Sequence, residues 1–200
     1  APRKARRVPI DFPGFALNSL SVRMFNQAYW SRVPRDGLER RSAYREFLFP
    51  LDALHDWNRI YGKRGFHQFQ CVVPFEEGPA ALAKMLEMIS QSGRGSFLAV
   101  LKAMGPAGLG YLSFPRPGYT LALDFANAPG ARELIAQLER LTCDHGGRTY
   151  LAKDSTLSAE NLRRMYPDLE RFQDVLAQID PHSQMQSDMA RRLRLRERLR

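Results

Sequence analysis

The stretch that decides the fold opens with Phe66-His67-Gln68-Phe69-Gln70-Cys71-Val72-Val73, whose alternating and β-branched residues predict a strand. Apolar residues then recur at three- and four-residue steps over 79–91 and again over 131–143, which predicts two helices with one buried stripe each. Further strands are predicted at 97–102, 119–125 and 148–153. The order β-α-β-β-α-β predicts an α+β fold: a ferredoxin-like antiparallel sheet with both helices on one face.

The other face of this sheet is left without helices, and polar residues are expected on it. Side chains alternate between the two faces of a strand. Five polar residues are therefore expected to project from one surface: Gln68, Gln70, Lys102, Thr120 and Asp124. Together they could bind the hydroxyl groups of a ligand. An ordinary solvent-exposed face is the alternative, since antiparallel sheets often have one wet side.

A lysine stands near the end of the predicted sheet, in the stretch Gly146-Gly147-Arg148-Thr149-Tyr150-Leu151-Ala152-Lys153-Asp154-Ser155. An ammonium group beside apolar residues either reaches out to water or is held against an anionic or electron-rich ligand. The Gly- and Pro-rich stretch 105–118 is too long for a hairpin turn, and it is a candidate functional loop.

The segments outside this unit are predicted to be less regular. Before it we expect a helix over 20–30 with a buried stripe that includes Phe25 and Tyr29, a strand over 44–49 and a short helix over 51–61. After Ser155 we expect short helices at 159–166 and 168–179, and a basic helix from residue 187 or 188 to the end. Helices this short need a partner to pack on.

Charge is concentrated at the two ends of the chain. The net charge is +9; residues 1–7 hold four basic residues and no acid, and residues 189–200 hold six arginines and one glutamate. The ends thus carry +4 and +5, so the body between them is neutral. A neutral body argues against a nucleic-acid face. Basic tails more often promote solubility or loose contact with anions.

Composition points to an ordinary globular protein. With 200 residues, 44% of them hydrophobic, the chain can build a core. Two distant cysteines and four scattered histidines predict no metal site. The sequence has no run of eighteen apolar residues and no signal-peptide pattern at its start, so we expect no transmembrane segment and a cytoplasmic protein.

Three groups of motifs, in order along the chain, resemble one family. The first is Phe49-Pro50-Leu51-Asp52 with Trp57-Asn58-Arg59, and the second is Gln68-Phe69-Gln70-Cys71-Val72-Val73-Pro74. The third is Tyr150-Leu151-Ala152-Lys153-Asp154-Ser155 with Met165-Tyr166-Pro167 and Ser187-Asp188-Met189-Ala190-Arg191-Arg192-Leu193. They resemble the C-terminal part of FAD-linked oxidoreductases of the vanillyl-alcohol oxidase group, in particular decaprenylphosphoryl-β-D-ribose 2′-oxidase-like and sugar-lactone oxidase-like proteins.

This resemblance implies a domain arrangement. Residues 1–147 would form the substrate-binding domain, and 148–200 would be the C-terminal segment of an FAD-binding domain whose N-terminal half is absent from the chain. The cofactor implied is FAD, bound in the full-length protein. The partners implied are a sugar or polyol-type substrate and the missing half, and the 200-residue chain alone is expected to be inactive.

The resemblance also implies a set of site residues. The catalytic residues would be Lys153 and Lys102. The substrate-binding residues would be Gln68, Gln70, Thr120, Asp124, Tyr150, Leu51, Phe97 and Leu98. The implied reaction oxidises a hydroxyl while hydride passes to the flavin, with the lysines in positioning and electrostatic roles. Ala122 and Leu48 replace a cysteine and a tyrosine of the mycobacterial relatives, so a polyprenyl-ribose substrate is not assigned.

A non-enzymatic ferredoxin-like module, binding RNA or a protein partner on its open face, is the alternative function. RNA-binding sheets of this kind stack bases on aromatic residues of the central strands. The glycine-aromatic signature of such strands is missing here, and the open face is expected to carry amide and carboxylate groups. We therefore do not expect a nucleic-acid partner.

Overall fold

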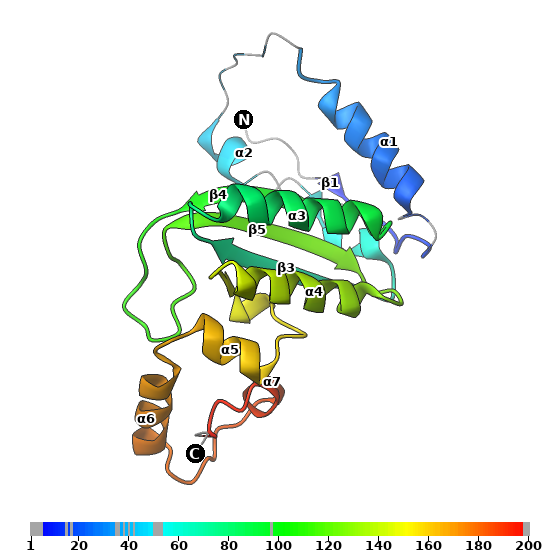
Figure 1. Ribbon diagram of the computed structural model, residues 1–200. Helices are drawn as coiled ribbons and strands as arrows, with labels where there is room; N and C mark the ends of the chain where they lie inside the picture. Colours follow the sequence, from blue (N-terminus) through cyan, green and yellow to red (C-terminus); the bar gives the residue numbers. More distant parts are fainter. Residues whose placement is uncertain are drawn as a thin grey trace.

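The computed structural model describes residues 6–14, 16, 18–34, 37, 39, 41, 43–49, 54–96 and 98–197 (Figure 1). Its strands are β1 (Arg6–Arg7), β2 (Leu54–His55), β3 (Phe66–Val73), β4 (Ala99–Met104), β5 (Gly118–Ala126) and β6 (Arg148–Thr149). Its α-helices are α1 (Ser19–Trp30), α2 (Tyr44–Leu48), α3 (Gly78–Gln91), α4 (Ala131–Asp144), α5 (Ala159–Met165), α6 (Leu169–Ile179) and α7 (Asp188–Arg192). The described residues also form two short 3-10 helices: η2 (Trp57–Tyr61) and η3 (Leu151–Lys153). The predicted α+β class is confirmed.

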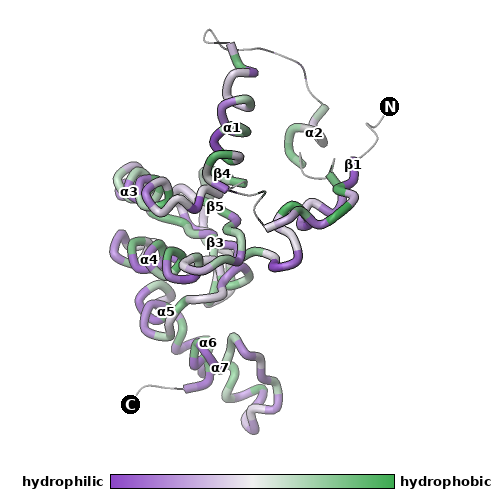
Figure 2. Tube along the Cα trace, turned by 90° about the vertical axis from the view of Figure 1, so that its right-hand side faces the viewer, coloured by the Kyte–Doolittle hydropathy of each residue, from purple (hydrophilic) through white to green (hydrophobic). Residues whose placement is uncertain are grey.

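The centre of the molecule is a four-stranded sheet with the order β4-β5-β3-β6. Every neighbouring pair is antiparallel, and β3 pairs with β5 along its whole length, from Phe66 opposite Ala126 to Val73 opposite Tyr119. Helices α3 and α4 lie side by side on one face of this sheet (Figures 1 and 2). The opposite face is free of these helices, as the sequence predicted.

The main hydrophobic core fills the space between the sheet and the two helices. From β3 and β5 it takes alternate residues: Phe69, Cys71, Val73, Leu121, Leu123 and Phe125. From the helices it takes most of the predicted stripes, among them Leu82, Met85, Ile89, Leu134, Ile135 and Leu138, whereas Leu86, predicted for the same stripe, is exposed. Because one face of each central strand is buried, a shift of one residue would expose the whole set, and the core thereby fixes the strand register.

A second hydrophobic core gives the short C-terminal helices their packing partner. It joins Cys143 at the end of α4 to buried residues of the last third of the chain: Leu157, Leu162, Met165, Tyr166, Leu169, Leu193 and Leu195. The Tyr166 hydroxyl donates a hydrogen bond of 2.6 Å to the Thr149 carbonyl, which ties this core to the sheet. Helix α7 ends at Arg192, whereas a helix to the end of the chain was predicted.

The predicted strand at 44–49 and helix at 51–61 are wrong. Tyr44–Leu48 is a short helix, and the later stretch divides into β2 and η2. β2 pairs in parallel with β1, a long-range pairing that the local pattern does not reveal. Asp56 then adopts φ 55°, a left-handed conformation through which an α-helix cannot continue. The expected cap of that helix, Asp52, lies outside the described residues.

Helix α1 is confirmed, but its predicted buried stripe is not. Val22 is buried, whereas Met24, Phe25 and Tyr29 are exposed. The helix stands away from the sheet along most of its length (Figures 1 and 2), so its apolar side chains have little described structure to pack against.

Lys153 does not lie on a strand as predicted. Strand β6 ends at Thr149, although the Tyr150 amide still donates a hydrogen bond of 2.8 Å to the Gln70 carbonyl at the edge of β3. The chain then turns through η3, closed by a hydrogen bond of 3.0 Å from the Lys153 amide to the Tyr150 carbonyl. This turn carries Lys153 past the edge of the sheet.

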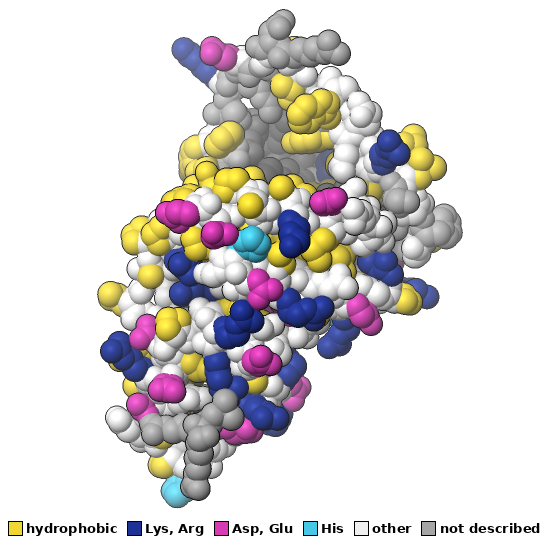
Figure 3. All heavy atoms as spheres, viewed as in Figure 1, with side chains coloured by type: hydrophobic (Ala, Val, Ile, Leu, Met, Phe, Trp, Pro, Cys, Tyr) yellow, Lys and Arg dark blue, Asp and Glu magenta, His cyan; other side chains and the backbone are white. Residues whose placement is uncertain are grey.

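Charged residues of both signs are mixed over the face shown in Figure 3, where α4 and the C-terminal helices lie. Among the described residues, no helix is long and apolar enough to cross a membrane. The same residues contain no group of three or more His, Cys, Asp or Glu side chains placed to hold a metal ion. Both cysteines are free thiols.

Candidate functional site

A cavity of about 180 Å³, lined by several polar side chains, lies on the face of the sheet opposite α3 and α4. Its lining comes from five elements or their flanks: Trp57, Gln68, Gln70, Leu98, Val100, Lys102, Thr120, Ala122, Asp124 and Lys153. The strand residues in this set are separated by steps of two, because alternate side chains of a strand share a face. The five polar residues predicted for one surface are therefore brought together, and Lys153 joins them from η3.

Two hydrogen bonds across β3 and β5 organise the floor of the cavity. Gln68 donates from Nε2 to Oδ1 of Asp124 at 3.0 Å, and Gln70 donates from Nε2 to Oγ1 of Thr120 at 3.1 Å. Thr120 and Asp124 are buried, at 2% and 3% exposure. The Gln68–Asp124 and Gln70–Thr120 hydrogen bonds hold these four polar side chains in fixed orientations. A ligand would therefore meet polar groups that are already oriented to bind it.

Asp124 is the most unusual group in the cavity. Its Oδ1 accepts the bond from Gln68, but its Oδ2 is buried and has no hydrogen-bond partner among the described residues. Burial raises the pKa of this carboxyl, while the bond from Gln68 and the positive charge of Lys153 act in the opposite direction. A buried polar atom without a partner costs free energy, so it marks a place where a ligand can supply one.

Two lysines from different elements line the same cavity as this carboxylate. Lys153 is partly buried on η3, and Lys102 is exposed on β4, where it is the register partner of Thr120. Neither ammonium group makes a hydrogen bond or ion pair with another described residue. Each can therefore donate to a ligand oxygen without first breaking an internal contact.

The remaining predicted site residues lie in different places. Leu98 lines the cavity, just before β4. Tyr150 does not line it; its ring stacks on Phe114 of the 105–117 loop, with ring centroids 4.6 Å apart. Tyr150 thus packs against the loop that joins β4 to β5. Leu51 and Phe97 lie outside the described residues, so their predicted roles stay predictions.

Sequence reasoning missed two residues of the lining, Trp57 and Val100, and it noted Ala122 only as the replacement for a cysteine of the relatives. Val100 lies midway between Leu98 and Lys102, so strand alternation alone could have placed it on this face. The same alternation does put Ala122 on this face, between Thr120 and Asp124. For Trp57 the only signal was its position in one of the family-like motifs, because η2 is held beside the sheet by tertiary packing of its Trp57 and Tyr61 rings on Phe66 of β3.

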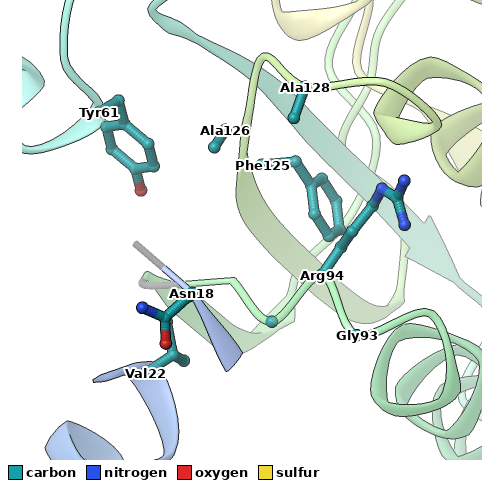
Figure 4. A pocket seen from close by; sticks show the side chains of 9 residues that line it. Asn18, Val22, Tyr61, Gly93, Arg94, Phe125, Ala126 and Ala128 are labelled. Atoms are coloured by element: carbon teal, nitrogen blue, oxygen red, sulfur yellow. The ribbon is translucent and has the colours of Figure 1, made fainter. Parts of the chain in front are cut away.

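A second cavity, of about 100 Å³, lies between the start of α1 and the end of β5 (Figure 4). Its lining is largely small or apolar, and its one charged residue is Arg94. The Arg94 guanidinium already donates hydrogen bonds to the carbonyls of Ser92 and Pro129. This cavity therefore has fewer polar groups available to bind a ligand than the cavity that contains Asp124.

The sequence of this chain is similar to those of known oxidases. Residues 122–193 match the family model described as D-arabinono-1,4-lactone oxidase. The chain is 41% identical over 188 residues to the decaprenylphosphoryl-β-D-ribose oxidase of Mycolicibacterium smegmatis, which covers 94% of this chain and 40% of that protein. It is also 37% identical over 115 residues to an uncharacterised protein of Streptomyces coelicolor, described by its place in the mprA 5′ region, covering 57% of this chain and 31% of that protein.

The chain thus spans less than half the length of either relative. The family match contains Asp124, Tyr150 and Lys153, and so includes part of the cavity described above. Together the matches confirm that this chain resembles FAD-linked oxidases of sugars and sugar lactones, as its motifs predicted.

Proposed function

We propose that this chain is the substrate-binding portion of an FAD-dependent oxidoreductase that oxidises a hydroxyl of a sugar, lactone or polyol. The observation that carries the proposal is the buried Oδ2 of Asp124, which has no hydrogen-bond partner among the described residues and lies in a cavity lined also by Lys102 and Lys153. A substrate hydroxyl can donate to that oxygen while its own oxygen accepts from a lysine. No apolar or purely anionic ligand would satisfy both kinds of group.

The size of the cavity supports a small ring as its occupant. At about 180 Å³ it lies below the roughly 300–1,000 Å³ typical of sites for drug-sized ligands. A whole FAD does not fit it, and we assign no described residue to holding the cofactor. Oxidation removes an electron pair from the carbon, and FAD is the acceptor that the family resemblance implies.

The residues of this chain would act on the hydroxyl that is oxidised. Asp124 would hold and then accept its proton at Oδ2, a role favoured by burial because burial raises the pKa of the carboxyl. Lys153 would donate a hydrogen bond to the same oxygen and stabilise the negative charge that develops on it. Gln68 would keep the Asp124 carboxylate in one orientation through its bond to Oδ1.

The rest of the ring would be held at the cavity's other polar groups. Lys102, Gln70 and Thr120 can bind further hydroxyls, and the Trp57 ring can pack against the apolar face of a sugar. Ala122 leaves space at the centre of the lining, opposite Gln70 in the register. These features define a class of substrate and do not select one sugar.

We further propose that residues 1–147 form the substrate domain and that 148–200 complete an FAD-binding domain whose larger part lies outside this chain. Strand β6 joins the sheet at the start of the second segment, so the two would be connected through the sheet and through Tyr166. On this proposal the 200-residue chain alone does not turn over substrate.

The proposal is tested in the full-length protein with a panel of aldonolactones, pentoses and polyols, scored by bleaching of the flavin absorbance. We expect reduction by at least one substrate, and its loss in Lys153→Ala with FAD still bound. Lys84→Ala, an exposed lysine on α3, is the matched control and should behave as wild type. Full activity of the Lys153→Ala protein, or failure of every substrate to reduce the flavin, would overturn the proposal.

A further inference from the structure

We infer that Asp154 and Arg192 form a clamp that positions Lys153, so that the last described helix of the chain controls the lysine in the cavity. The inference rests on the proposed function for its catalytic consequence. The clamp itself stands on contacts that involve neither substrate nor cofactor. Asp154 and Arg192 act through Lys153 and are therefore positioning residues.

Asp154 directly follows Lys153, and its side chain is completely buried. Its Oδ1 accepts hydrogen bonds from the amides of Thr156 and Leu157, at 2.9 and 2.8 Å. Its Oδ2 accepts from the Arg192 guanidinium at 2.6 Å. A buried carboxylate with three donors is held far more rigidly than one on the surface, and it closes the turn immediately after Lys153.

Arg192 brings a distant element to this turn. It is the last residue of α7, and its guanidinium also donates a hydrogen bond of 2.5 Å to the Leu157 carbonyl. The next residue, Leu193, is fully buried in the second core. The position of the guanidinium is therefore set by the packing of the C-terminal helices, 35 residues or more from the turn it holds.

A third element supports the same turn from the side of the main core. The Thr156 hydroxyl donates a hydrogen bond of 2.8 Å to Glu139, a buried residue of α4. Residues 154–157 are thus held by α4, by α7 and by their own backbone. This matters for Lys153 because its ammonium makes no hydrogen bond or ion pair with other described residues, so the backbone of its turn is what directs it toward the cavity.

The first test measures the lysine itself in the 200-residue chain, without flavin or substrate. Lys153 is acylated with a trace amount of acetic anhydride, and its labelling rate is read by mass spectrometry. We expect a several-fold change in Arg192→Met and a smaller one in Arg192→Lys, which keeps a donor to Asp154. Arg191→Met removes an exposed ion pair with Asp188 on the same helix and should leave the rate unchanged.

The second test measures turnover in the full-length protein. A shift of about 1 Å in a reacting group can cost on the order of 100-fold in rate, so Arg192→Met should lower kcat by roughly 10- to 100-fold while KM changes little. Arg192→Lys should restore part of kcat. A purely structural role predicts loss of folded protein with normal kcat per bound flavin, and that result would overturn the inference.

The two tests separate the inference from the proposed function. If no substrate reduces the flavin but Lys153 labelling still depends on Arg192, the clamp stands and the proposed function fails. If Arg192→Met does not fold, Asp154→Asn takes its place, because asparagine can still accept at Oδ1 from the turn amides while losing the charge that binds Arg192. Unchanged labelling of Lys153 in a folded clamp variant would refute the inference.

Discussion

Gln68 and Asp124 are register partners on the two central strands, and a hydrogen bond of 3.0 Å joins their side chains across the open face of the sheet. The bond uses one carboxylate oxygen of Asp124 and leaves the other buried without a partner among the described residues. The sheet therefore holds a carboxylate that is oriented but only half satisfied. Such a group costs stability and is retained where a ligand completes it.

Asp124→Asn is expected to raise stability at neutral pH and to lower turnover. Burial raises the pKa of Asp124 above the value of 3.8 that it has in the unfolded chain. The protonated carboxyl therefore stabilises the folded chain fully below pH 3.8, and this stabilisation is lost as pH rises through the pKa of the folded chain. Asparagine keeps an acceptor for Gln68 and carries no charge at any pH. Removal of a proton acceptor should cost about 10²- to 10⁴-fold in kcat of the full-length protein.

Urea unfolding at pH 3 and pH 7 checks the stability part of this prediction. The advantage of Asp124→Asn over wild type should be larger at pH 7. Asp11→Asn, which changes an exposed carboxylate, should show no such difference. An Asp124→Asn protein that is less stable than wild type at pH 7 would contradict the assignment of Oδ2 as an unsatisfied group.

Glu139→Gln should remove a pH dependence of stability. Burial raises the pKa of Glu139 to about 8, with Asp154 adding to the rise, while the Thr156 bond and the charges of Arg192 and Arg140 oppose it. The folded chain thus keeps a proton that the unfolded chain releases near 4.5. Stability of wild type relative to Glu139→Gln should fall between these two pH values, by at most about 1.4 kcal/mol per pH unit, and level off above them.

Chemical unfolding of both proteins from pH 4 to pH 9 measures this slope directly. Glu133→Gln provides the control, since Glu133 lies exposed on the same helix. If wild type and Glu139→Gln respond to pH in parallel, Glu139 is ionised in the folded chain and the explanation by burial fails.

Phe114→Ala should destabilise the chain by about 3 kcal/mol, the low end of the cost for removing a buried phenylalanine. Phe114 is 6% exposed and is the residue through which the 105–117 loop stacks on Tyr150. Tyr111→Ala, at an exposed position of the same loop, should change stability by no more than about 0.5 kcal/mol. Equal effects in urea unfolding would mean that the loop is not anchored through Phe114.

Gly147→Ala should destabilise the chain by roughly 1–3 kcal/mol through overpacking. A Cβ at Gly147 would lie 2.5 Å from the Val72 carbonyl oxygen and 2.9 Å from Cγ2 of Thr142, at the point where α4 gives way to β6. Gly110→Ala is the control, because a Cβ there meets nothing within 4 Å. Thermal unfolding compares the two variants. Similar melting temperatures would contradict the prediction and show that the backbone between α4 and β6 can shift to accommodate a Cβ at little cost.

The sheet could be predicted because each central strand buries one face. Phe69, Cys71, Leu121 and Leu123 enter the core at steps of two, and that alternation is visible in the sequence. The same alternation placed Gln68, Gln70, Thr120 and Asp124 on the opposite face, and they do line one cavity. Where a strand has a core face, the sequence also determines its other face.

The parts that were predicted wrongly depend on long-range contacts. At residues 54–55 the pairing of β2 with β1 replaces the predicted helix by a strand, and the partner of that strand lies almost 50 residues earlier in the sequence. Lys153 was expected on a strand because 148–153 completes the predicted β-α-β-β-α-β order, yet Asp154 and Arg192 hold the chain there in a turn. The partner of Asp154 lies 38 residues away, beyond the reach of any local pattern.

The alternation of β3 and β5 has an evolutionary consequence. In the middle of β3 and β5, odd positions such as Phe69, Cys71, Leu121 and Leu123 belong to the core, while Gln68, Gln70, Thr120, Ala122 and Asp124 line the cavity. The two sets can therefore accumulate substitutions with little mutual interference. A replacement at Ala122 can alter the shape of the cavity and leave the fold intact. Single amino-acid replacements can therefore change what the cavity binds while the core stays the same.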